Sequence, residues 1–425
     1  MPTIIFDNLS SPNGVAFDSV GNLYISSLVS TSSAFLNIPP SIPAITKISP
    51  SGAIVDKLLL NSFAAPKLQV IPDSDILIAL DENGSFSVID STNLSLINSF
   101  NLNSLPKDKS AVFDISTGDV GDFSALIPSG LSTFGDFDIR VTENSIQFFI
   151  TGLSQAQAFP FVFRFDVIDG FITDPKVLFS STADVFSVAP QSPRIGRGIA
   201  VNDQGVVLTT LPLPMSQQPI DFPLIFDADL DFSSGINRNS LFVLDQIDIY
   251  SQGMTTDALG NFYIATNSVG SGALGVAGEG ALVVISSNFS EIVFAQGIGL
   301  VNSSFLDVAI DPLSGVPFVT VNDQFSPITG GGDFLVGFPE AIPQGQLTPT
   351  GLLIDDMLES DDLVVASATL DTELILDFPV QDYQISQLQT VGISTVTSVP
   401  EKPLEVVSST PIQTPEAWPD TLLTL

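Results

Sequence analysis

The stretch "GVAFDSVGNLYISS" (residues 14–27) contains two apolar segments separated by a short polar turn. The small and apolar residues of "GVAF" fit a buried strand, and "LYISS" fits a second strand that runs back along it. Between them, Asp18 to Asn22 predict a tight turn in which Gly21 takes the positive φ that such turns require. The stretch therefore predicts a β-hairpin.

Hairpins of the same form recur along the whole chain. After the first, they read "LQVIPDSDILIAL" (68–80), "DFDIRVTENSIQFFIT" (136–151), "GIAVNDQGVVLTT" (198–210), "GMTTDALGNFYIATNS" (253–268) and "DVAIDPLSGVPFVTV" (307–321). Their starting positions are between 54 and 68 residues apart. Six copies at such a period indicate one supersecondary unit that is repeated and stacked.

Further strand pairs with turn signals lie between the hairpins. They occupy residues 45–60, 86–100, 162–179 and 281–295. Each unit then has about four strands, which is one blade of a propeller. We therefore predict an all-β fold: a six-bladed β-propeller over residues 1–356. The strand Pro2–Asn8 is expected to close the ring as the outer strand of blade 6, because closure removes a free seam.

Residues 357–425 do not continue the repeat and are predicted to form a C-terminal extension. Its first half is β-prone, and its second half is rich in proline, which suits an extended arm. Three alternatives stay open: the extension packs on its own propeller, it adds strands to a neighbouring copy, or it is disordered. Trp418, the single tryptophan, is a candidate anchor for an arm.

The composition excludes several classes of function. The 425 residues include 12 basic and 47 acidic side chains, for a net charge of −35. Such a surface repels phosphate backbones and anionic lipid, so we expect no nucleic-acid partner and no membrane insertion. The acidity alternatively serves solubility alone. With no cysteine, the chain has no disulfide, thiolate catalyst or cysteine zinc site. With no histidine, it lacks the usual general base and the commonest transition-metal ligand.

The repeat "NGVAFDSVGNLYIS" (residues 13–26) resembles those of the NHL-repeat and SMP-30/gluconolactonase-like six-bladed propellers, over about residues 2–356. In lactonase-type members a calcium-like ion lies at the channel mouth, and one ligand is the Asn of a "PNG" start. The resemblance implies Asn13 alone as a metal ligand here. Asp136 and Asp307, at equivalent positions before other inner strands, are candidate further oxygen donors. Equivalent positions hold Lys67 and Arg197, which would oppose a cation. Alternatively, Asn13 stabilises the turn into its strand.

Two acidic segments elsewhere are candidate calcium loops. "DADLDFSSGINR" (227–238) begins like an EF-hand loop, but Phe232 and Arg238 replace the glycine and glutamate that such a loop needs. "DISTGDVGDFS" (114–124) reads as an acidic insertion in blade 2. Each is alternatively a solvated loop.

The functional expectation is a non-catalytic exported or cell-surface module, although no signal peptide is visible. It would bind a protein or a glycan, or form a homo-oligomer or polymer through its propeller faces and C-terminal arm. The alternative is a metal-dependent lactonase- or esterase-like hydrolase with its site at the channel mouth around Asn13. No catalytic residue is assigned, and Ca²⁺ is the only cofactor that the resemblance allows.

Overall fold

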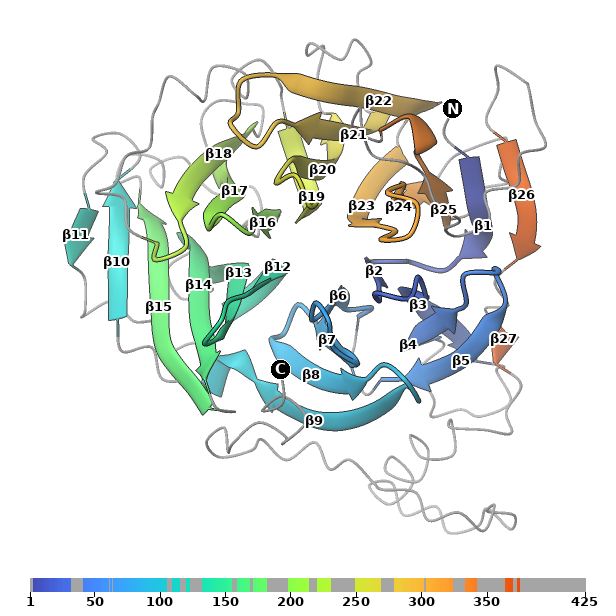
Figure 1. The fold of residues 1–425 in the computed structure, drawn as a ribbon, viewed down its shortest axis with the longest axis horizontal. Coiled ribbons are helices and arrows are strands. Elements are labelled where there is room, and N and C mark those ends of the chain that lie inside the picture. Colours follow the sequence, from blue (N-terminus) through green and yellow to red (C-terminus); the bar gives the residue numbers. More distant parts are fainter. Residues whose placement is uncertain are drawn as a thin grey trace.

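The computed structural model is an all-β, six-bladed propeller whose blades form a ring around a central axis (Figure 1). The structure describes residues 3–31, 41–60, 62, 64–104, 109–114, 120–122, 132–154, 159–168, 171–181, 198–213, 220–230, 249–268, 279–301, 303–323, 333–341, 364–369 and 373–374. The predicted fold class is confirmed, whereas the predicted domain boundary at residues 356 and 357 lies outside these ranges.

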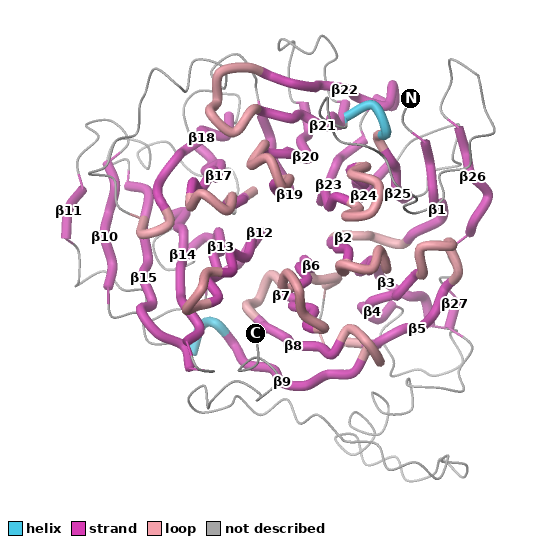
Figure 2. The backbone as a smooth tube through the Cα atoms, viewed as in Figure 1, coloured by secondary structure: helices cyan, strands magenta, loops and turns pink. Residues whose placement is uncertain are grey.

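Each blade is an antiparallel sheet with its first strand nearest the axis (Figure 2). Blade 1 contains β2 (Gly14–Phe17), β3 (Leu23–Thr31), β4 (Ser41–Ile48) and β5 (Ile54–Leu59), and blade 2 contains β6 (Lys67–Val70), β7 (Ile76–Leu80), β8 (Ser85–Asp90) and β9 (Ser95–Asn101). Blade 3 contains β12 (Ser132–Val141), β13 (Ile146–Ser154), β14 (Phe159–Ile168) and β15 (Phe171–Ser181), and the described strands of blade 4 are β16 (Ile199–Val201), β17 (Val206–Leu213) and β18 (Ile220–Asp227). Blade 5 contains β19 (Ile249–Thr256), β20 (Phe262–Ser268), β21 (Glu279–Ile285) and β22 (Ile292–Val301), and blade 6 contains β23 (Ser303–Ile310), β24 (Pro317–Asp323) and β25 (Asp333–Gly337).

The N-terminal strand closes the ring, as predicted. Strand β1 (Thr3–Leu9) pairs antiparallel with β25 and thereby becomes the fourth strand of blade 6. The first and last segments of the propeller are then joined by main-chain hydrogen bonds, and the seam between the chain's two ends is covered. The short 3-10 helix η5 (Pro339–Ala341) follows β25.

Extra strands are added to three blades, of which blades 3 and 6 lie on opposite sides of the ring (Figure 1). On blade 6, β26 (Val364–Thr369) pairs parallel with β1, and nearby β27 (Glu373–Leu374) pairs parallel with β3 of blade 1. On blade 3, β10 (Lys109–Asp114) pairs parallel with β15 and antiparallel with β11 (Val120–Asp122). The acidic insertion assigned to blade 2 therefore joins blade 3: it follows the 3-10 helix η1 (Leu102–Ser104) in sequence but pairs with the outer strand of the next blade.

The repeated hairpin turn is stabilised by its aspartate. Gly21 has a φ of +82°, as the turn requires. Asp18 Oδ1 accepts the backbone N–H of Asn22 at 2.7 Å, and its Oδ2 accepts the Asn22 side-chain amide at 2.7 Å. The Tyr24 hydroxyl lies 2.9 Å from Asp18 Oδ2 and 3.1 Å from the Ser91 carbonyl oxygen of blade 2. The turn of blade 5 repeats this arrangement with Asp257, Gly260, Asn261 and Tyr263. The motif therefore fixes the turn and also orients a tyrosine on the second strand.

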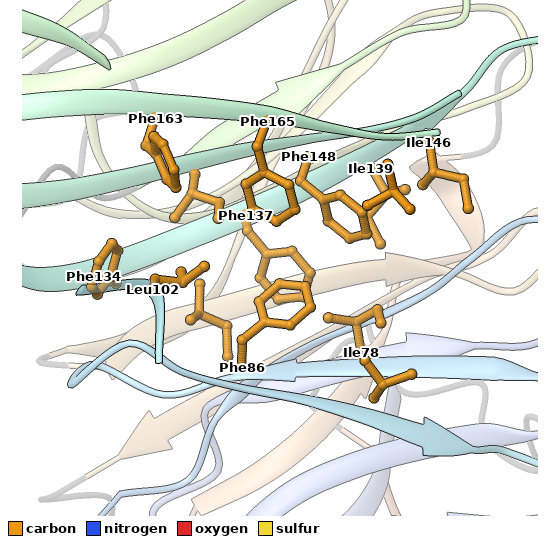
Figure 3. Packing of buried hydrophobic residues seen from close by; sticks show 14 of the residues in the cluster. Ile78, Phe86, Leu102, Phe134, Phe137, Ile139, Ile146, Phe148, Phe163 and Phe165 are labelled. Atoms are coloured by element: carbon orange, nitrogen blue, oxygen red, sulfur yellow. The ribbon is translucent and has the colours of Figure 1, made fainter. Parts of the chain in front are cut away.

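The hydrophobic core lies between blades. The largest cluster joins blades 2 and 3 and is dominated by phenylalanine (Figure 3). The rings of Phe148 and Phe165 are stacked with centroids 4.8 Å apart, and Phe86 meets Phe148 edge-on at 5.4 Å. Such contacts bury large apolar areas and add specific ring geometry. In the described part of the chain, no helix has the length and apolar character needed to span a membrane.

Candidate functional site

The innermost strands of all six blades contribute to one buried polar network at the axis. We call it the axial network and define it as the side chains of Lys67, Asp136 and Asp307 with the groups they contact. Lys67 begins β6, whereas Asp136 and Asp307 lie in the middle of β12 and β23. All three residues are buried, with exposed fractions of 5%, 2% and 4%. Buried charges are stable only when paired and hydrogen-bonded, so their partners decide what this site can do.

Lys67 extends from blade 2 to the far side of the ring. Its ammonium donates to the carbonyl oxygen of Gln252 in blade 5 at 2.9 Å and to that of Leu306 in blade 6 at 2.5 Å. The same nitrogen lies 3.3 Å from Asp307 Oδ1. An ammonium group has three donors, and here it has three oxygen partners.

Asp136 connects blade 3 to the next two blades. Its Oδ2 accepts the backbone N–H of Ile199 in blade 4 at 3.1 Å and that of Met254 in blade 5 at 3.1 Å. Two residues further along β12, Asp138 Oδ2 accepts the N–H of Val201 in blade 4 at 2.8 Å. Because side chains two apart on a strand share a face, both carboxylates point toward blade 4.

Asp307 connects blade 6 to blade 1, the next blade around the ring. Its Oδ2 accepts the N–H of Val15 at 2.9 Å. The carboxylate fits here because blade 5 has a glycine at the point of contact: a Cβ on Gly253 would collide with Asp307 Oδ1 and with the Asp307 Cα. The opening glycine of this repeat is therefore explained by close packing at the axis.

The other opening glycines meet neighbouring strands in the same way. A Cβ on Gly14 would lie 2.5 Å from the carbonyl oxygen of Pro66 in blade 2. Ser26 Oγ joins these two segments, because it accepts the Gly14 N–H at 2.7 Å and donates to the Pro66 oxygen at 2.5 Å. In blade 4, Gly198 N–H donates to Ser251 Oγ of blade 5 at 3.1 Å. Hydroxyl groups thus satisfy the backbone where blades approach most closely.

Burial dominates the electrostatics of the network. It raises the pKa of Asp136 well above its ordinary value; the Lys67 ammonium opposes this shift and the Asp307 carboxylate adds to it. Burial also raises the pKa of Asp307, again against the effect of Lys67. Burial raises the pKa of Asp138 to about 7, although hydrogen bonds from Val201 and Ile139 oppose the rise. These carboxyl groups therefore hold a proton more readily than exposed aspartates do.

The three residues predicted as metal ligands are only partly brought together. Asp136 and Asp307 belong to one network, whereas the Asn13 side-chain amide donates to the Ala65 carbonyl oxygen at 2.7 Å. Among the described residues, no group of three or more acidic side chains is arranged to hold a metal ion. The oxygens nearest the axis fit a metal ion poorly, because the Lys67 ammonium already lies among them. The metal assignment stays a prediction, and Arg197 lies outside the described residues.

The EF-hand-like segment participates in a different contact. Asp229 Oδ1 accepts Arg164 NH1 of blade 3 at 2.8 Å, and the same nitrogen donates to the Ala228 carbonyl at 2.6 Å. Arg164 also forms a two-point pair with Asp166, at 2.8 and 2.7 Å. Burial opposes the charge of Arg164, but the bonds to Asp166 and Asp229 outweigh it and raise the pKa. The described part of this loop therefore links blades 3 and 4 through Arg164. We call these contacts of Arg164 with Asp166, Ala228 and Asp229 the clamp.

Two further basic side chains also join blades. Lys47 of blade 1 donates to the Ser91 carbonyl oxygen of blade 2 at 2.7 Å, and Arg140 of blade 3 donates to the Asp203 carbonyl oxygen of blade 4 at 3.1 Å. Sequence reasoning missed this role. The only available signal was that basic residues are scarce, 12 in 425, and that several lie within predicted strands.

No protein-family model matches the chain, and a search of curated proteins found no match.

Proposed function

We propose that the protein is a non-catalytic, exported or cell-surface β-propeller that acts as a binding or self-assembly module through its faces and C-terminal arm. Kinship with the NHL-repeat and SMP-30-like propellers is part of this proposal, resting on the repeat sequence and the six-bladed architecture. Fold alone does not fix function, because the same architecture supports catalysis and binding.

The observation that carries the proposal is the pairing of β26 with β1. The ring is already closed when β1 pairs with β25, yet a strand from beyond the propeller adds to the other edge of β1. Strand addition to a sheet edge is a common mode of peptide recognition, in which main-chain hydrogen bonds supply affinity. The closing blade is thus able to accept a strand.

The same pairing could form between two chains. Residues 342–363 separate η5 from β26, and a fully extended segment of this length spans at most about 80 Å. A strand on a connection of this length can reach β1 of a neighbouring copy. In such an assembly each chain would offer one β26 and accept one, so the contact would repeat head to tail.

The axial network supports a non-catalytic role. Its carboxylates bind backbone N–H groups of neighbouring blades, and its ammonium binds two backbone carbonyls. Groups with such partners hold the ring together. The buried Asp136–Asp307 pair, with its raised pKa values, is the observation that favours the alternative of a lactonase- or esterase-like hydrolase, because perturbed carboxyl groups concentrate at active sites.

Light scattering on the full-length protein tests assembly. The comparison includes the wild type, a chain truncated after Asp356, and the full-length variant V365P/A368P, whose prolines remove backbone donors from β26. The matched control is V365T/A368T, which keeps those donors and a β-compatible side chain. We expect large assemblies for the wild type and the control, and a smaller mass for the other two. A wild type that stays monomeric at all concentrations, with and without Ca²⁺, would contradict self-assembly and leave the binding module as the proposal.

A lactone hydrolysis screen with and without Ca²⁺ tests the alternative. Turnover that is abolished in D136N and D307N, while both variants keep the wild-type circular dichroism spectrum, would favour the hydrolase. Absence of turnover, together with assembly, favours the module.

A further inference from the structure

We propose that the propeller axis contains a cation site that the chain fills with its own Lys67 ammonium, in place of the metal ion that the family resemblance implies. The proposal concerns how the ring is held together and does not depend on whether chains assemble.

The partners of the ammonium are those that a hard cation selects. Two are backbone carbonyl oxygens, of Gln252 and Leu306, and the third is a carboxylate oxygen of Asp307. Carbonyl and carboxylate oxygens are the usual ligands of Ca²⁺ in proteins. The three come from two adjacent blades and converge on one point, to which Lys67 reaches from a blade on the other side of the axis.

The surroundings are built to keep a positive charge at this point. Asp136 is buried beside this point, because its Oδ2 accepts the N–H of Met254, two residues along the chain from the Gln252 carbonyl that Lys67 binds. Gly253 leaves room for the Asp307 carboxylate, and the Val15 N–H holds the other carboxylate oxygen. Two buried carboxyl groups therefore face one buried ammonium, and removing the ammonium would leave them without a cation.

A tethered ammonium has one advantage over a free metal ion. It is present at fixed stoichiometry in any medium, so the axis does not need external Ca²⁺ to be neutralised. Its reach also links blade 2 to blades 5 and 6, which a bound ion could do only if blade 2 supplied a ligand.

The test compares two substitutions of Lys67. K67A removes the ammonium and opens space beside the three oxygens, whereas K67M removes the charge but keeps a side chain of similar length. Calorimetric titration with Ca²⁺ and thermal unfolding with and without millimolar Ca²⁺ are the two measurements. We expect K67A to bind about one Ca²⁺ per chain and to unfold several degrees higher in its presence. The wild type and K67M should show neither effect.

The double variant K67A/D307A identifies the site, because it removes the carboxylate ligand and should lose the Ca²⁺ response of K67A. If K67A folds only when Ca²⁺ is present, the proposal is supported. If K67A fails to bind or respond to Ca²⁺ while K67M folds, the oxygens do not form a cation site. If the wild type binds Ca²⁺ and D307N abolishes that binding, Lys67 is not the occupant, and the proposal is overturned. None of these outcomes depends on the mass measured by light scattering.

Discussion

Blade 3 presents opposite kinds of surface to its two neighbours. Toward blade 2, its strands β12, β13 and β14 contribute Phe137, Phe148 and Phe165 to the phenylalanine-rich core. Toward blade 4, the alternate positions of β12 and β14 carry Asp138 and Arg164. Both faces are buried, although one has the composition of a core and the other that of a surface. Whether a face of a blade is buried therefore depends on the neighbouring blade that covers it, and a polar face can be buried as fully as an apolar one.

The apolar face of blade 3, which contacts blade 2, should lose more stability than the polar face when one side chain is truncated. Phe148 is fully buried and contacts the rings of Phe86 and Phe165. F148A should lower the free energy of unfolding by about 3–5 kcal/mol, because it removes apolar contacts and leaves a cavity. Chemical denaturation measures the change. F148L, which keeps most of the volume, is the control, and a loss from F148A below about 1 kcal/mol would contradict this view of the core.

The polar face of blade 3, which contacts blade 4, should tolerate replacement of both members of a charged pair better than replacement of one member. R164M leaves Asp166 buried without its cation and should lower the free energy of unfolding by about 3 kcal/mol. R164M/D166L removes both charges, so it should recover most of that loss. The same denaturation experiment compares the two.

Asp229, the exposed partner of Arg164, provides a control substitution. The Asp229 side chain is 74% exposed, so D229N should change the free energy of unfolding by less than about 1 kcal/mol. If R164M/D166L is no more stable than R164M, the unpaired charge of Asp166 does not account for the instability of R164M.

The two faces should also differ in their response to pH. The raised pKa of Asp138, about 7, means that the folded state binds its proton more tightly than the unfolded state does. Its contribution is therefore fully present below about pH 4 and is lost as the pH rises through about 7, at up to about 1.4 kcal/mol per pH unit.

Urea unfolding between pH 4 and 8 measures this dependence. The difference between the wild type and D138N isolates the Asp138 term, because the other groups are common to both. D73N, at an exposed turn residue, is the control. A constant difference between wild type and D138N over this range would contradict the shifted titration.

The smallest expected effect concerns a contact within the polar face. The Arg164 guanidinium lies 5.9 Å from the centroid of the Phe149 ring, a cation–π arrangement. In a double-mutant cycle with R164M and F149L, we expect a coupling free energy of about 0.5–1 kcal/mol. A coupling of zero would mean that Arg164 is held by its bonds to Asp166, Asp229 and the Ala228 carbonyl, with no contribution from the Phe149 ring.

Most of the architecture was predictable because it depends on local pattern. The repeat "GVAFDSVGNLYISS" specifies a hairpin with a positive-φ glycine, and Gly21 has that conformation. The period of the repeat predicted six blades, and the spare strand at the N-terminus predicted closure on blade 6. These are properties of consecutive residues, so they can be read along the chain.

The candidate site was less accessible. The sequence singled out Asp136 and Asp307 but treated Lys67 as an obstacle to a cation, whereas the structure places its ammonium against the Asp307 carboxylate and two backbone carbonyl oxygens. The prediction that the acidic insertion at residues 114–124 belongs to blade 2 is wrong, because chain order does not say which sheet edge a segment will fill. Both outcomes depend on contacts between segments far apart in sequence.

The hairpin, the number of blades and the closing strand can therefore be read from the sequence, because each follows from turn chemistry and strand period. Which polar residues are buried depends on how the blades pack together. A strand such as "DFDIR" (136–140) alternates in the same way whether its polar face meets water or another blade. In the ring, a second blade packs against that face and excludes water. The buried aspartate, lysine and arginine side chains must then find partners on the neighbouring blades, and these hydrogen bonds join the blades.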